Sequence, residues 1–144
     1  MAMQPISPED RRVVNINDAD FTPWESAENP GTSYLQLDTT RPPGVGFYIY
    51  RMEPGSRSDP HEHVGTEEFL MLEGELIDHD GAVYRPGDLV WLAPGTKHNS
   101  HTKTGCLIAV FAERGEKSAD DDRARDLDSR SGAASLSPQG MTDR

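Results

Sequence analysis

Short runs of apolar residues, separated by turn-forming residues, recur along the chain from Val13 to Glu113. Most runs are rich in β-branched or aromatic side chains, which favour strands, and the Gly, Pro and Asp clusters between them favour turns. Runs that recur about every ten residues are typical of an antiparallel sandwich or barrel. No segment before residue 113 has helical periodicity. The pattern predicts strands over residues 13–16, 33–37, 46–52, 67–72, 75–78, 82–84, 88–92 and 106–111.

The two ends of the chain lack this pattern. Residues 1–12 are polar, contain two prolines and predict a flexible arm. Residues 116–144 begin with a charge-dense run and continue with small polar residues, so they offer no apolar face to a core. We therefore expect one all-β domain over residues 13–115, with the arm before it and a disordered acidic tail after it.

The composition limits which binding partners and which cellular compartment are expected. The chain has a formal net charge of -11, with 25 acidic and 14 basic residues. Such a surface repels phosphates and anionic lipids, so we expect no nucleic-acid or membrane partner. Cys106 is the single cysteine, which excludes an internal disulfide. A single cysteine favours a reducing, cytoplasmic location. We expect Cys106 to be a small buried apolar residue.

Candidate chemistry is concentrated in the histidines, all five of which lie between positions 61 and 101. His61 and His63 are two residues apart, so in a strand both imidazoles point to the same face. Glu67 follows a short Val-Gly-Thr turn and can direct its carboxylate toward them, and His98 supplies a third imidazole from a later turn. Three imidazoles and one carboxylate suit one divalent transition metal ion, Fe²⁺, Mn²⁺, Ni²⁺, Co²⁺ or Zn²⁺, better than Ca²⁺ or Mg²⁺.

These residues carry a family resemblance. The run Gly55-x5-His61-x-His63-x3-Glu67-x6-Gly74 resembles the first motif of the cupin superfamily at every defined position. The resemblance implies an antiparallel double-sheet jelly roll, the cupin barrel, with a metal ion inside it.

A later run resembles the second cupin motif. Gly87-x6-Pro94 fits, whereas the spacing from Pro94 to His98 is one residue short and Thr102 replaces the usual asparagine. This variant resembles the branch that contains the ChrR anti-sigma metal domain and small dioxygenases such as acetylacetone dioxygenase. His98 and His101 are three apart and face opposite sides of a regular strand. His98 matches the motif, so we expect it to be the ligand and His101 to lie at the rim.

The resemblance implies a ligand set of His61, His63, Glu67 and His98. It also implies a dioxygenase that acts on a small chelating dicarbonyl, enediol or hydroxyketone, with Fe²⁺ as the expected ion of an enzyme and Zn²⁺, Ni²⁺ or Mn²⁺ as alternatives. Glu67 is the candidate catalytic residue, because it either stays a ligand or dissociates and acts as a base. A metal-dependent isomerase or lyase and a non-enzymatic metal-binding sensor are the competing functions.

Strand alternation suggests the substrate pocket. If the carboxylate ligand points inward, Phe69 and Met71 do so as well. The predicted strand over residues 46–52 also alternates, and the sequence leaves open whether Arg51 or Tyr50 faces the cavity. An inward Arg51 would anchor an anionic or carbonyl substrate, whereas an outward one would form a surface ion pair.

The opposite face of the same strand predicts a partner. Leu70 and Leu72 would face outward and need cover. A second subunit would supply it, so we expect a homodimer. The alternative is that residues 21–24 of the same chain cover these leucines.

Overall fold

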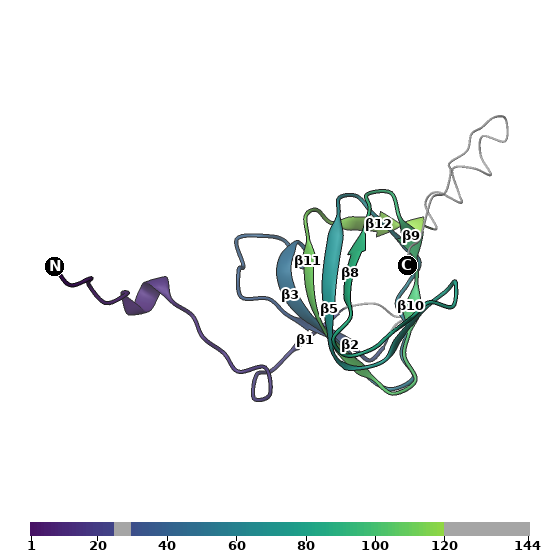
Figure 1. The fold of residues 1–144 in the computed structure, drawn as a ribbon, viewed down its shortest axis with the longest axis horizontal. Coiled ribbons are helices and arrows are strands. Elements are labelled where there is room, and N and C mark those ends of the chain that lie inside the picture. The colour runs from purple at the N-terminus through teal and green to yellow at the C-terminus, as the bar shows by residue number, and fades with distance from the viewer. Residues whose placement is uncertain (25–29, 120–144) are drawn as a thin grey trace.

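The computed structural model describes residues 1–24 and 30–119. Within them the chain forms a β-barrel from one six-stranded and two three-stranded antiparallel sheets (Figure 1). The elements are η1 (Pro8–Asp10), β1 (Thr22–Pro23), β2 (Thr32–Leu35), β3 (Gly46–Met52), β4 (His61–His63), β5 (Glu67–Gly74), β6 (Leu76–Asp78), β7 (Val83–Tyr84), β8 (Leu89–Leu92), β9 (Lys97–His98), β10 (Ser100–His101), β11 (Cys106–Ala112) and β12 (Glu116–Ser118).

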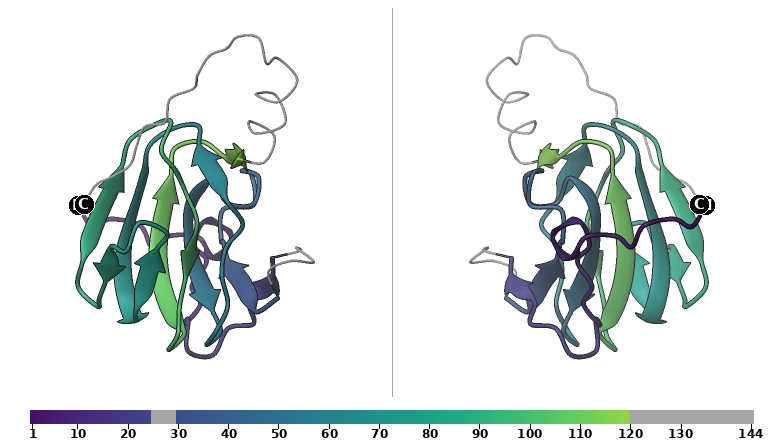
Figure 2. Two further views of the ribbon diagram at one scale, coloured as in Figure 1. Left: turned by 90° about the vertical axis from the view of Figure 1, so that its right-hand side faces the viewer. Right: turned by 90° about the vertical axis from the view of Figure 1, so that its left-hand side faces the viewer.

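The large sheet forms one wall of the barrel. Its order is β1-β2-β3-β11-β5-β8, and the small sheets have the orders β10-β6-β7 and β12-β4-β9. Figure 1 shows β9, β10 and β12 across the barrel from β3 and β11. Figure 2 shows the long strands running side by side. The expected double-sheet jelly roll is therefore confirmed, with its second layer divided into two small sheets.

The core fills the space between the layers because the long strands alternate. Phe69 and Met71 in β5 are 4 % and 1 % exposed, whereas Leu70 between them is 37 % exposed. In the antiparallel pair, Val110 of β11 lies opposite Phe69, and Ile108 lies opposite Met71. Residues opposite one another project to the same side of a sheet, so these side chains form one continuous apolar layer.

The N-terminal prediction is partly wrong. Residues 13–16 form no strand, and Val13 is 79 % exposed. The segment before β1 leads away from the barrel (Figure 1). An apolar run forms a strand only where its backbone finds a neighbouring strand, and no described residue provides one here. No helix in the described residues is long and apolar enough to cross a membrane.

The C-terminal boundary also differs from the prediction. Residues 116–118 were expected to lie in the tail but form β12, which pairs with β4. The strand is polar, and backbone pairing at the edge of β4 holds it rather than apolar burial. The barrel thus extends beyond residue 115. Residues 120–144 of the predicted tail lie outside the described part of the chain.

Candidate metal centre

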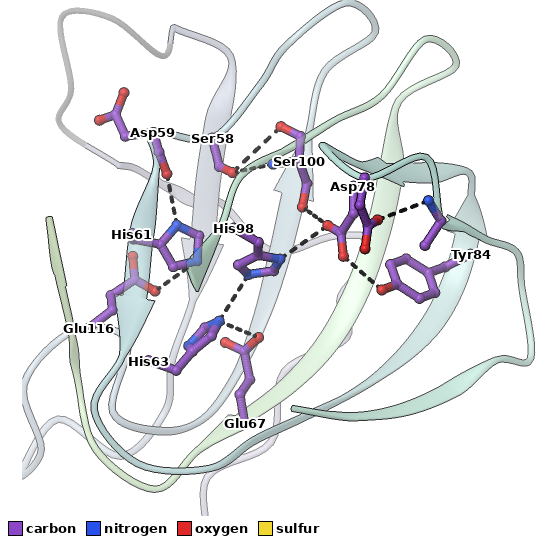
Figure 3. A network of polar contacts seen from close by, with 12 residues as sticks. Ser58, Asp59, His61, His63, Glu67, Asp78, Tyr84, His98, Ser100 and Glu116 are labelled. Carbon is purple, nitrogen blue, oxygen red and sulfur yellow. Dashed lines mark hydrogen bonds and ion pairs between the residues drawn. The ribbon is translucent and has the colours of Figure 1, made fainter. Parts of the chain in front are cut away.

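Two neighbouring strands bring the histidines together. His61 and His63 alternate with Glu62 along β4, and His98 of β9 lies opposite His61. The three rings converge in the barrel, with centroids 4.6–4.9 Å apart. Glu67, the first residue of β5, directs its carboxylate at His63 (Figure 3).

In two of the rings, the nitrogen that points away from the cluster forms a hydrogen bond. Nδ1 of His61 donates to the carbonyl of Asp59 over 2.7 Å, and Nδ1 of His98 donates to the carboxylate of Asp78 over 3.1 Å. Because Nδ1 carries the proton, Nε2 of each neutral ring keeps a lone pair. These lone pairs are directed to the point that His63 also reaches (Figure 3). The rings are therefore oriented as metal ligands before an ion binds.

The inner atoms have the separations expected of ligands that share one ion. Nε2 of His63 is 2.9 Å from Nε2 of His98 and 3.3 Å from Oε1 of Glu67. Ligands that are each about 2.1 Å from a transition metal lie roughly 3–4 Å from one another. Two ring nitrogens this close need a proton or a cation between them. His61, His63 and His98 could thus hold a metal ion, and the donor set fits one.

Burial sets the charge of the site. It lowers the pKa of His63 to about 2, with the neighbouring histidines as a further cause, so this ring stays neutral. Burial also raises the pKa of Glu67 to about 8; a protonated His98 would oppose this rise, and the charge of Glu116 adds to it. A cation would offset the cost of a buried carboxylate and would use the imidazole lone pairs.

Asp78, to which the sequence analysis gave no role, supports His98. It ends β6 and accepts hydrogen bonds from His98, from the hydroxyl of Tyr84 over 2.7 Å and from Ser100 (Figure 3). Burial alone would raise the pKa of Asp78, but these hydrogen bonds outweigh it and lower the pKa. In the sequence, the only sign that Asp78 faces inward is its position two residues after Leu76 in the strand predicted over residues 75–78.

A cavity of about 120 Å³ lies beside the histidines. Its wall includes His61, Glu67 and His98, and Phe69 lines it as predicted. Met71 also faces inward but lies in the core and not on this wall. The apolar and aromatic part of the wall consists of Trp24, Tyr48, Tyr50, Met52, Phe69, Leu76, Ile108 and Val110.

Arg51, one of the two alternatives that the sequence left open for the pocket, does not line the cavity. Tyr48 and Tyr50 of β3 line it, and alternation therefore turns Arg51 outward. The register decides this parity, because Tyr50 lies opposite the buried Ile108 of β11. On the outside, the guanidinium of Arg51 lies over the ring of Phe21, with Cζ 3.9 Å from the ring centroid.

The remaining histidines lie outside the cluster. His101 is in β10 and does not belong to the group of rings that could hold an ion. His79 is exposed, as expected. By contrast, Glu116 joins the site: it lines the cavity, and its carboxylate forms a second possible ligand group with His63 and Glu67. Glu116 was not a candidate from the sequence, because the polar run that begins at residue 116 predicts a tail.

A double-layered β-barrel with three histidines and a carboxylate converging inside it defines the class of metal-binding cupins. Residues 9–115 match the family model of the ChrR Cupin-like domain, and the chain belongs to this family. The resemblance seen in the sequence is therefore confirmed. Comparison with curated protein sequences gives no match.

Solved structures similar to this chain share its fold. The polyketide cyclase RemF from Streptomyces resistomycificus is 19 % identical, with a TM-score of 0.61 over 75 % of this chain and 84 % of that one. An acetylacetone dioxygenase from Acinetobacter johnsonii is 17 % identical, with a TM-score of 0.59 over 78 % and 80 %. The complex of SigE with the anti-sigma ChrR from Rhodobacter sphaeroides gives 17 % identity and a TM-score of 0.52, over 67 % of this chain and 49 % of that one.

Proposed function

We propose that this cupin is a metal-dependent dioxygenase that acts on a small chelating dicarbonyl, enediol or hydroxyketone. The observation that carries the proposal is the cluster of three histidine ring nitrogens, with the Glu67 carboxylate 3.3 Å from Nε2 of His63, at the wall of a cavity. His61, His63, Glu67 and His98 are the proposed ligands. A bound Fe²⁺ would supply Lewis acidity and redox chemistry at a position next to the substrate.

The cavity wall supports a small substrate with an apolar body. Tyr48, Tyr50 and Phe69 offer large aromatic surfaces, and Trp24 packs against both tyrosines with ring centroids 5.8 Å apart. Burying an apolar substrate against them excludes water from the reacting atoms. The acidic groups lie at the histidine end, where Glu67 and Glu116 line the cavity.

Glu67 has a proton-transfer role in this proposal. Its carboxyl group is buried at the cavity wall, where it could accept a proton from a bound substrate. Oε1 lies 3.3 Å from His63, so the same group is also placed to be a ligand. The names of two neighbours support chemistry on carbonyl compounds, since acetylacetone is a dicarbonyl and polyketides carry ketone groups.

Two measurements on the full chain test the proposal. The first is elemental analysis of protein purified without added metal or chelator, and the second is oxygen uptake with a panel of dicarbonyls. Iron or nickel together with oxygen uptake would support a dioxygenase. Turnover that needs no oxygen would replace it with an isomerase or lyase. Tightly bound zinc with no turnover on the panel would leave a sensor or structural metal module.

A further inference from the structure

Glu116 lies where a ligand of the same ion would lie. It occupies the first position of β12, directly opposite His63 of β4. Residues that face one another across an antiparallel pair project to the same side of the sheet, so its side chain enters the barrel with that of His63. Its Oε2 atom is 3.7 Å from Nε2 of His61, and Figure 3 shows the carboxylate directed at this ring.

The second carboxylate also balances the charge of the site. Carboxylate oxygens of Glu116 and Glu67 and a ring nitrogen of His63 all lie within 4.8 Å of one another. Two carboxylates that face each other repel, and a divalent cation between them removes that repulsion. Three neutral imidazoles and one carboxylate would leave a buried divalent ion with a net positive charge, whereas a second carboxylate makes the centre neutral. Burying a neutral metal centre costs less free energy than burying a charged one.

We propose that Glu116 is a second carboxylate ligand of the metal ion, so that the ion attaches strand β12 to the rest of the site. This inference rests on the proposed metal centre. Glu67 is the deeper carboxylate, with a side chain 10 % exposed, whereas that of Glu116 is 42 % exposed and lies at the outer side of the cavity. Glu116 is therefore the ligand nearer to solvent.

The attachment has a mechanical consequence for the end of the barrel. Strand β12 is three residues long and pairs only with β4 among the described strands. Its other contacts include the ion pair of Lys117 with Glu62 over 3.8 Å and the hydrogen bond from the amide of Ala119 to the carbonyl of Pro60. So short an edge strand opens readily, and a bond from Glu116 to a bound ion would hold it closed.

The test compares Glu116→Gln with Glu62→Gln in the full chain. Glu62 lies on β4 between the two histidine ligands and forms the ion pair with Lys117, so its substitution loosens the same strand pair without removing a proposed ligand. Each metal-free protein is titrated with Co²⁺, and the visible absorption spectrum and the dissociation constant are recorded. Amide hydrogen exchange in residues 113–119 is then measured with and without the ion.

We expect Glu116→Gln to change the Co²⁺ spectrum, to weaken binding about tenfold or more, and to abolish the slowing of amide exchange in β12 that the ion causes in the wild type. Glu62→Gln should keep the wild-type spectrum and the metal-dependent slowing. Weaker binding with an unchanged spectrum would mean that Glu116 acts through its charge alone, and it would overturn the inference. A wild-type spectrum and affinity in Glu116→Gln would also overturn it but leave the metal centre intact. Failure of the wild type to bind Co²⁺ would sink both proposals.

Discussion

At the scale of single residues, the orientation of two ligand histidines depends on the hydrogen-bond acceptor on the far side of each ring. His61 has a backbone carbonyl and His98 has the buried carboxylate of Asp78. A carboxylate behind a ligating imidazole fixes its tautomer and makes the inner nitrogen a better donor. Asp78 is itself held by Tyr84 and Ser100, so the position of His98 depends on a network that reaches β7 and β10.

Replacing Asp78 by Asn tests this support. The amide keeps the size of the side chain but loses the charge, so we expect metal affinity to fall by about 10–100-fold. Titration with Zn²⁺ against a chelator of known affinity measures the change. Asp80→Asn is the matched control, because Asp80 is exposed in the adjacent turn. Equal affinities in the two variants would contradict the role of Asp78.

Replacing His63 by Ala tests the ligand set. At an ion concentration a hundred times the dissociation constant, a bound ion stabilises the native state by about 2.7 kcal/mol. We expect His63→Ala to lose the ion and with it the difference in melting temperature between metal-loaded and chelator-treated protein. His79→Ala, which changes an exposed histidine, should keep that difference. Wild-type metal content in His63→Ala would refute the assignment.

Cys106 offers a prediction on pH. It is 6 % exposed, and burial raises the pKa of its thiol to about 11. Only the thiolate reacts with iodoacetamide, so the rate in native protein should rise about tenfold per pH unit from pH 8 to 10. In denaturant the rate should be higher at pH 8 and should level off near the ordinary pKa of a thiol. Mass spectrometry follows the reaction, and similar rates in the two states would contradict the prediction.

At the scale of elements, strand β5 connects the core to the metal centre. It begins with Glu67, passes through the buried Phe69 and Met71 and ends at Gly74. Gly74 has a φ of 77°, and a Cβ atom there would lie 1.9 Å from the carbonyl oxygen of Gly105. The end of β5 thus meets the chain just before β11 at a distance that only glycine permits.

Gly74→Ala should therefore be far more costly than an ordinary glycine substitution. We expect a loss of about 2–4 kcal/mol in the free energy of unfolding, because left-handed strain and a backbone clash add together. The control is Gly81→Ala, where φ is 92° but nothing lies within 4 Å of an added Cβ. Its cost should be about 1 kcal/mol. Denaturant unfolding measures both free energies of unfolding. Equal losses in the two variants would contradict the prediction, because they would show that the backbone moves to relieve the clash at Gly74.

At the scale of the whole molecule, the outer face of the large sheet is apolar. Leu70 of β5 lies opposite Leu89 of β8, and Phe111 of β11 lies opposite Phe47 of β3. Leu89 is 78 % exposed and Phe47 is 60 % exposed. In the alternative cover, residues 21–24, Trp24 packs against Tyr34 with ring centroids 4.8 Å apart, and Leu70 stays 37 % exposed.

The homodimer stays a prediction, and this face is its proposed interface. Apolar groups on the outside of a sheet are covered well by an identical sheet related by a two-fold axis. Light scattering should give a mass twice the 15.9 kDa of the chain. Trp91→Glu, which places a charge on a side chain 57 % exposed in β8, should give monomers. Val83→Glu in β7 is the control, and a monomeric wild type would refute the prediction.

Sequence alone was enough for features that depend on neighbours along the chain. The alternation of apolar residues predicted most strands and the inward side of Phe69 and Met71, because side-chain direction in a strand has a period of two. The same period placed His61 and His63 on one face. Spacing along the chain also brought Glu67 within reach of them, and the cupin motif pointed to His98.

Tertiary structure decided what depends on a partner strand. Arg51 and Tyr50 were equivalent in the sequence, and only the register with β11 turned the arginine outward. Glu116 belongs to a polar segment that forms a strand because the edge of β4 is there to pair with it. Asp78 meets His98 across 20 positions of sequence through strands of different sheets. Backbone pairing and burial are long-range effects, so local pattern cannot specify which of two faces, or which polar side chain, they select.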